Sequence, residues 1–162
     1  MKQKGIIMKK LIAPEESEGS TFDLSVSLTS EPRTLDPALS GQGDGTVMLH
    51  HLFEGLVKWA DNGSGQGILA PGMAEYWEVN NNGTEYIFHL RKDALWSDGE
   101  PVTAEDFVYA WRRLVNPETG AENSYALDMV VNGEKVRERK VRPSKLGVTA
   151  VDEESLKVSL TY

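Results

Sequence analysis

The chain has 162 residues, enough for one hydrophobic core, and its 40% hydrophobic and 26% charged residues are those of an ordinary globular protein. Its net charge of -8 disfavours nucleic acid as a partner, and the absence of cysteine excludes disulfides, zinc–thiolate sites and cysteine nucleophiles. No apolar run approaches the roughly 20 residues that a membrane-spanning helix needs.

The first 45 residues predict a flexible lead, a strand and a loop. Residues 1–20 begin with lysines but contain no apolar stretch of the kind that a signal peptide has. Residues 21–28 alternate between apolar and polar side chains, the pattern of a half-buried strand. The sequence Leu35-Asp36-Pro37 favours an extended or turn conformation, and residues 40–45 read Ser-Gly-Gln-Gly-Asp-Gly, the composition of a loop.

The next segments predict a short helix, a strand and a hairpin. Thr46 can cap a helix that runs to about Glu54, with Gly55 as its stop and with an apolar face made of Leu49, Leu52 and Phe53. Residues 56–59 favour a short strand, and residues 61–67 a loop. Two alternating runs flank the turn sequence Asn-Asn-Asn-Gly, so we expect a β-hairpin over residues 76–90.

The second half of the chain predicts two helices and two strands. Thr103 is expected to be the N-cap of a helix that ends at Asn116-Pro117, with an apolar stripe of Phe107, Ala110, Trp111 and Leu114. Residues 124–131 favour a helix, and residues 146–150 and 156–160 favour strands. This mixture of elements predicts an α+β (mixed α/β) fold.

Several short motifs also follow one another in the order that is typical of one protein family. With them the chain resembles the N-terminal part of the bacterial extracellular solute-binding proteins of family 5, in the oligopeptide-binding branch that serves ABC importers. The motifs are Thr-Leu-Asp-Pro (34–37), Leu-Phe-Glu-Gly-Leu (52–56), Ala-Pro-Gly-Met-Ala-Glu-Tyr-Trp (70–77), Tyr-Ile-Phe-His-Leu-Arg (86–91), Trp-Ser-Asp-Gly (96–99), Pro-Val-Thr-Ala-Glu-Asp-Phe (101–107) and Leu-Gly-Val-Thr-Ala-Val-Asp (146–152).

The resemblance implies a fold like that of type II periplasmic binding proteins, with a small β-sheet flanked by helices. Residues 21–45 would supply the first-lobe strand and the ligand-edge loop, and residues 46–162 an accessory α+β domain and the start of the return to the first lobe. It further implies a monomeric, periplasmic or extracytoplasmic protein, lipid-anchored in some full-length parents. Such a protein binds short peptides through their backbone, delivers them to an ABC permease, has no enzymatic activity and needs no metal or cofactor.

The same resemblance assigns candidate ligand-binding residues. In the family, the loop after the Leu-Asp-Pro motif supplies part of the edge to which an extended peptide adds as a strand. By position this loop is Ser40, Gly41, Gln42, Gly43 and Asp44. Its glycines either admit a ligand backbone or only make a flexible turn, and both readings stay open. A second family contact, an aromatic side chain after the long helix, falls on Asn123 here, with Tyr125 as a possible substitute.

Two other functions fit single features of the sequence. His50, His51 and Glu54 have the spacing of a helical metal site, which would suit a metal-dependent hydrolase. Residues 135–145, called the basic segment below, hold six Lys and Arg residues in an acidic protein, which would suit an interaction domain. The simpler interpretation of both features is a solvated polar surface.

Overall fold

The structure is a computed structural model that describes residues 27–41 and 43–162. The expected lead (1–20) and most of the expected first strand (21–28) lie outside these residues, and Ser27 and Leu28 belong to no strand. None of the helices in the described part of the chain is long and apolar enough to cross a membrane. The elements in chain order are α1 (Asp44–Leu52), β1 (Val57–Asp61), β2 (Gly67–Pro71), β3 (Ala74–Asn80), the 3-10 turn η1 (Asn81–Gly83), β4 (Glu85–Leu90), α2 (Ala104–Val115), η2 (Ser124–Leu127), α3 (Gly133–Arg137), η3 (Pro143–Lys145), β5 (Val148–Ala150) and β6 (Ser155–Ser159).

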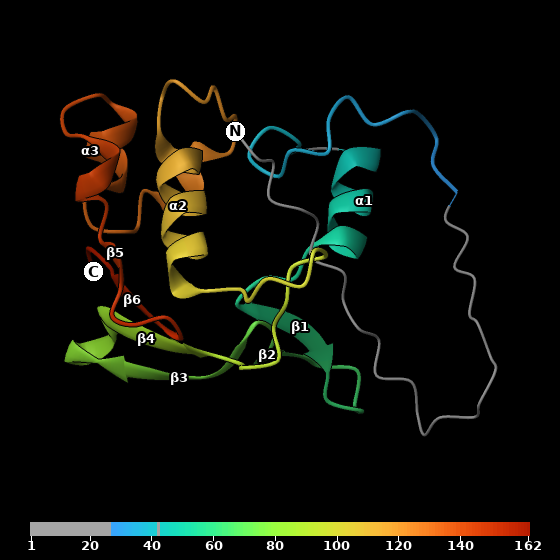
Figure 1. Ribbon diagram of the computed structural model, residues 1–162, viewed down its shortest axis with the longest axis horizontal. Helices are drawn as coiled ribbons and strands as arrows, with labels where there is room; N and C mark the ends of the chain where they lie inside the picture. Colours follow the sequence, from blue (N-terminus) through green and yellow to red (C-terminus); the bar gives the residue numbers. More distant parts are fainter. Residues whose placement is uncertain (1–26, 42) are drawn as a thin grey trace.

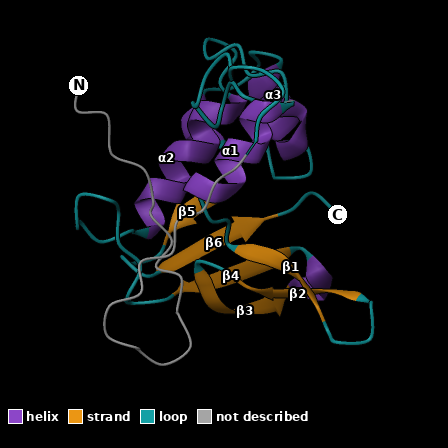
Figure 2. Cartoon of the chain, turned by 90° about the vertical axis from the view of Figure 1, so that its right-hand side faces the viewer, coloured by secondary structure: helices purple, strands orange, loops and turns teal. Residues whose placement is uncertain are grey.

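The strands form two antiparallel sheets, and the helices lie on one side of them (Figures 1 and 2). The larger sheet has the order β3-β4-β6-β5, and the smaller is the β1–β2 hairpin. The predicted hairpin over residues 76–90 is confirmed as β3 and β4, and the two predicted C-terminal strands are confirmed as β5 and β6. These elements establish the expected mixed α+β fold.

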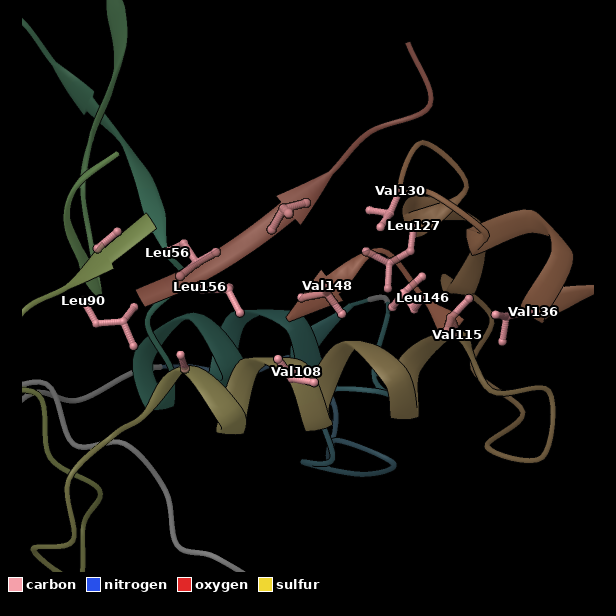
Figure 3. Packing of buried hydrophobic residues seen from close by; sticks show 13 residues of the cluster. Leu56, Leu90, Val108, Val115, Leu127, Val130, Val136, Leu146, Val148 and Leu156 are labelled. Carbon is pink, nitrogen blue, oxygen red and sulfur yellow. The ribbon is translucent and has the colours of Figure 1, made fainter. Parts of the chain in front are cut away.

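Helix α2 covers the β5–β6 side of the larger sheet and forms the main core with it. As predicted, the helix starts directly after Thr103. The buried side chains of α2 are Ala104, Val108 and Val115, whereas Phe107, Trp111 and Leu114 are half-buried and Ala110 is exposed. Val108 points toward Val148 of β5, and Val115 lies farther along the helix, near Leu146 (Figure 3). Three of the four predicted stripe residues therefore contact the core, but the most deeply buried face of the helix is centred on other residues than those predicted.

A carboxylate fixes the start of α2. The Asp106 side chain accepts hydrogen bonds from the Thr103 N–H at 2.9 Å, from the Thr103 hydroxyl at 3.1 Å and from the Trp96 indole N–H at 3.2 Å. These bonds join the turn before the helix to its first residues, which is the role of a capping box. The N-terminal end of α2 is thus held in place by local sequence.

The structure differs from the prediction in three places. Helix α1 starts at Asp44 instead of Thr46, because Gly43 adopts a positive φ of 65° and allows the chain to turn earlier. It ends at Leu52, because Phe53 is extended and packs against the second small core around Met73. Strand β2 was missed: residues 67–71 lie in a segment whose pattern shows no alternation.

The helix predicted over residues 124–131 is wrong except for the single turn η2. Val130 is buried and forms an isolated β-bridge with Leu160. The N–H of Val131 donates to the Ser159 C=O at 2.8 Å. Pairing with the end of β6 therefore takes residues 130 and 131 out of any helix.

Candidate functional site

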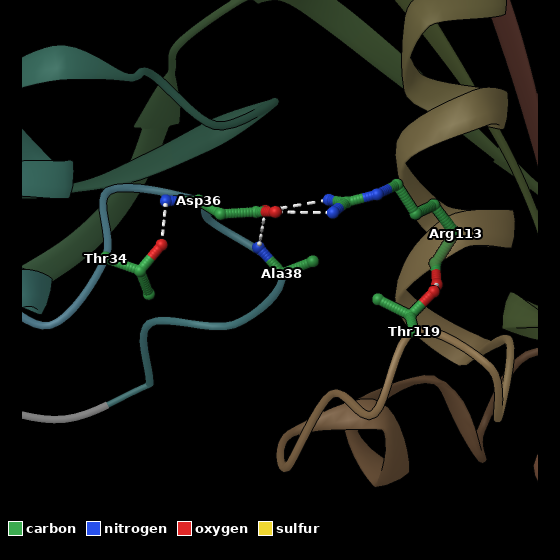
Figure 4. A network of polar contacts seen from close by, with 5 residues as sticks. All are labelled: Thr34, Asp36, Ala38, Arg113 and Thr119. Carbon is green, nitrogen blue, oxygen red and sulfur yellow. Dashed lines mark hydrogen bonds and ion pairs between the residues drawn. The ribbon is translucent and has the colours of Figure 1, made fainter.

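An ion pair joins the Leu35-Asp36-Pro37 motif to the last turn of α2 (Figure 4). The Arg113 guanidinium donates two hydrogen bonds to the Asp36 carboxylate, one of them at 2.7 Å to Oδ1. The same oxygen accepts the Ala38 N–H at 3.0 Å. The hydrogen bonds from Arg113 lower the pKa of Asp36 against the opposing effect of burial, so this carboxylate stays ionised. We call this pair the Asp36–Arg113 clamp.

The clamp and a tight turn after it set the path of the loop that follows. The N–H groups of Leu39 and Ser40 both donate to the Asp36 C=O, at 3.0 and 2.9 Å. On the helix side, the Thr119 hydroxyl donates to the Arg113 C=O at 2.6 Å. The start of the predicted ligand-edge loop is therefore anchored to α2, although the two segments are far apart in sequence.

The loop also has an anchor at its far end. The Asp44 carboxylate accepts hydrogen bonds from the Thr29 hydroxyl at 2.8 Å, the Ser30 hydroxyl at 2.8 Å and the Ser30 N–H at 2.6 Å. These bonds lower the pKa of Asp44. They give Asp44 a structural task, because its Oδ2 atom already holds residues 29 and 30 against the start of α1.

Between the two anchors, the chain presents a free stretch of backbone beside Asn123. A Cβ atom on Gly41 would lie 2.3 Å from the Asn123 Nδ2 atom, so the amide side chain lies directly against this glycine. Gly41 is exposed, and neither its N–H and C=O nor the C=O of Ser40 hydrogen bonds to another described residue. Exposed main-chain groups without partners are what strand addition requires.

The other predicted site residues occupy different environments. Ser40 turns its hydroxyl inward, since a Cβ atom on the buried Gly45 would lie 2.1 Å from the Ser40 Oγ atom. Gln42 lies outside the described residues. Gly43 is exposed with φ of 65°, and Tyr125 is 63% exposed. The structure thus brings Gly41 and Asn123 together, and it leaves the Tyr125 ring in solvent.

The arrangement does not support the alternative of a metal site at the end of α1. Glu54 lies beyond the helix, and its carboxylate pairs with Lys58 at 3.1 Å and with Arg91 at 3.3 Å. His51 points its Nδ1 atom at the Val47 C=O, 2.8 Å away in the same helix. No group of three or more possible metal ligands occurs among the residues that the structure describes.

Arg113, which anchors the start of the candidate loop, is a residue that sequence reasoning missed. It lies on α2, 77 positions after Asp36, and its spacing on the helix suggests only a solvated basic residue near the C-terminus. The one signal in the sequence for this contact was Asp36 itself. Its carboxylate can accept a hydrogen bond from Ala38 in the turn, and its charge favours a basic partner from elsewhere in the chain.

Comparisons with known proteins agree with this architecture. Residues 69–162 match the family model described as bacterial extracellular solute-binding proteins, family 5 Middle. The chain is 42% identical over 135 residues to the periplasmic murein peptide-binding protein MppA of Escherichia coli, covering 82% of this chain and 24% of MppA. It is 38% identical over 150 residues to the periplasmic oligopeptide-binding protein OppA of Haemophilus influenzae, covering 89% of this chain and 27% of OppA.

Solved structures of such proteins contain the same fold. The crystal structure of Haemophilus influenzae OppA in complex with a peptide superposes with a TM-score of 0.73 and 41% identity, over 82% of this chain and 25% of that one. The chain therefore belongs to the bacterial extracellular solute-binding proteins of family 5. It spans about a quarter of the length of the curated relatives that it matches.

Proposed function

We propose that this chain is part of the substrate-binding component of an ABC-type peptide importer and that it contributes one wall of the peptide site. Family membership supports the class of protein, since its relatives include proteins named for binding oligopeptides and murein peptides. The observation that carries the assignment to a place in this chain is that the Ser40 C=O and the Gly41 N–H and C=O hydrogen bond to no other described residue, with the clamp before them and the Asp44 bonds after them.

The proposed mode of binding is strand addition. A receptor for varied peptides gains affinity from what all peptides share, which is the backbone N–H and C=O groups. The C=O of Ser40 and the N–H and C=O of Gly41 supply one donor and two acceptors for an extended ligand. The space that a Gly41 side chain would fill holds the Asn123 amide, which therefore lies beside the edge as a further donor and acceptor.

Anchoring at both ends makes this edge suitable for recognition. A loop that is already ordered loses little conformational entropy when it binds, so more of the interaction energy appears as affinity. The clamp and the Asp44 bonds supply that order on either side of Gly41. Side chains of the ligand would remain in solvated space, which is consistent with broad specificity.

The proposed setting is that of the relatives. We place the protein outside the cytoplasm, as a monomer that delivers peptides to a permease, with a lipid anchor in the parent protein where the organism uses one. The chain alone is expected to bind short peptides weakly, because a single wall leaves the other side of the ligand in water.

The test is a titration of the ¹⁵N-labelled chain with a mixed tripeptide pool, followed by NMR. We expect amide shifts centred on Gly41 and Asn123. Gly41→Ala places its Cβ where the Asn123 amide lies; that side chain swings away at little cost in stability, and binding weakens about fivefold or more. Gly67→Ala on β2 is the matched control, because its Cβ meets only ordinary contact with Trp59. The proposed site would be refuted if the amide shifts did not include Gly41, or if Gly41→Ala and Gly67→Ala bound the peptides equally well.

A further inference from the structure

The basic segment, residues 135–145, differs in charge from the rest of the chain. It contains six basic residues and one acidic residue, a net charge of +5. Because the whole chain has a net charge of -8, the rest of the chain has a net charge of -13. The segment comprises the last three residues of α3, the turn after it and η3, and Glu134 of α3 directly precedes it. It forms one end of the molecule, with the β1–β2 hairpin and α1 toward the other end (Figure 1).

Most of these cations have no acidic partner. Arg137 donates two hydrogen bonds to Asp128, at 3.0 and 2.7 Å, and Lys140 pairs with Glu138 at 2.7 Å. The remaining four side chains are exposed and form no ion pair with any other residue that the structure describes; they are Lys135, Arg139, Arg142 and Lys145. In an acidic protein, such a group of unpaired cations creates a local positive potential.

Arg139 has a backbone conformation that residues with a side chain rarely adopt. Its φ is +62°, in the left-handed region. The Lys140 N–H donates to the Lys135 C=O at 2.8 Å, and the Arg139 N–H donates to the Val136 C=O at 2.9 Å, the hydrogen bonds of a Schellman motif that closes α3. Glycine is the residue that this position prefers. The arginine therefore supplies a charge at a local cost in stability.

The surface of the segment offers charge without apolar anchors. Its valines point inward, since Val136 is fully buried and Val141 is half-buried against the main core. Protein–protein interfaces usually have a desolvated centre of aromatic or aliphatic side chains. A surface of anionic headgroups needs no such centre, because it attracts exposed Lys and Arg through charge alone.

We propose that the basic segment is a docking surface for anionic lipid headgroups, which holds the protein against the membrane surface. That the protein meets a membrane at all rests on the proposed function as an importer component. Each unpaired cation near an anionic bilayer strengthens binding about fivefold, so the four together produce a measurable but reversible association. The segment contains neither Gly41 nor Asn123, so the two proposals rest on different residues.

The test is co-sedimentation of the chain with vesicles, either an equimolar mixture of phosphatidylglycerol and phosphatidylcholine or phosphatidylcholine alone. We expect binding to the anionic vesicles only. Binding is expected to disappear when salt is raised from about 0.1 M to about 1 M, where the screening length falls from about 10 Å to about 3 Å. Equal binding to both kinds of vesicle, or binding that resists salt, would overturn the proposal.

Three variants assign the effect to the segment. Arg139→Gly is expected to weaken vesicle binding about fivefold while its thermal midpoint rises, which separates lost charge from lost fold. The double variant Arg142→Gln with Lys145→Gln is expected to weaken binding about 25-fold. Arg33→Gln removes an exposed cation elsewhere and serves as the control, with binding unchanged.

Two outcomes would reject the lipid assignment. If Arg33→Gln weakens binding as much as Arg139→Gly does, overall charge and not the segment is responsible. If the chain binds polyglutamate but not anionic vesicles at the same salt, the segment recognises an acidic protein instead. Neither outcome affects the peptide titration, so the two proposals fail separately.

Discussion

Replacement of Asp36 by alanine removes the Asp36–Arg113 clamp, and the structure allows its cost to be worked out. The carboxylate accepts three hydrogen bonds, two from Arg113 and one from the Ala38 N–H. Each bond to a charged group contributes about 1.5 kcal/mol when buried. The exposed side-chain fractions are 28% for Asp36 and 34% for Arg113, so solvent screening reduces this value by about half. We therefore expect Asp36→Ala to lower the free energy of unfolding by about 2 kcal/mol.

The assay is urea denaturation together with hydrogen exchange. The midpoint should fall with an unchanged slope, and the amide of Ser40, which donates to the Asp36 C=O, should exchange faster. A cycle with Arg113→Ala isolates the pair, since the double variant should cost little more than either single one. Glu154→Gln, which breaks an exposed pair with Lys92 at 3.6 Å, is the matched control and should cost less than about 0.5 kcal/mol.

The clamp also predicts a dependence on pH. Because the folded pKa of Asp36 lies below 3.8, the ordinary pKa of an aspartate, its contribution is complete above that value and is lost as the pH falls through the folded pKa. Asp36→Asn should therefore flatten the acid limb of the curve of unfolding free energy against pH.

The stability prediction would be refuted by an Asp36→Ala variant that unfolds at the same urea concentration as the parent, with unchanged exchange at Ser40.

Two further predictions concern the core and a close backbone contact. Leu156→Ala, at a fully buried position, should cost about 3 kcal/mol in denaturant unfolding, whereas Val151→Ala at an exposed position should cost less than about 0.5 kcal/mol; equal costs would contradict the described core. Gly133→Ala should cost at least about 2 kcal/mol by the same measurement, because its Cβ would lie 1.8 Å from the Leu127 C=O oxygen; a neutral result would mean that the two segments do not touch.

Local sequence could predict the elements in which the apolar pattern agrees with the turn and capping residues at the ends. The hairpin β3–β4 has alternation on both sides of a turn, and α2 has a capping threonine and a proline just after its end. Both were predicted close to their observed bounds. Residues 130 and 131 show the limit, because their conformation depends on Leu160 and Ser159, which no local pattern reveals.

The candidate site could be predicted in part, and mainly from resemblance. The motif at Leu35-Asp36-Pro37 led to the loop that follows, and the described structure leaves the backbone of Gly41 unpaired there. The residues that hold this loop were not predicted. Arg113 reaches Asp36 from another element, and the carboxylate of Asp44, a residue of the predicted ligand-edge loop, binds Thr29 and Ser30. Such contacts depend on the tertiary fold, which charge and spacing along the chain do not encode.

The position of β6 between β4 and β5 governs when the chain can fold. The hairpin β3–β4 is contiguous, but β4 finds its second neighbour only when residues 155–159 pair with residues 85–89. A nascent chain therefore displays the open side of β4 until residue 159 has left the ribosome. An exposed strand edge of this kind invites pairing with other chains. Late closure of the sheet therefore lengthens the time during which the unfolded polypeptide needs protection from aggregation.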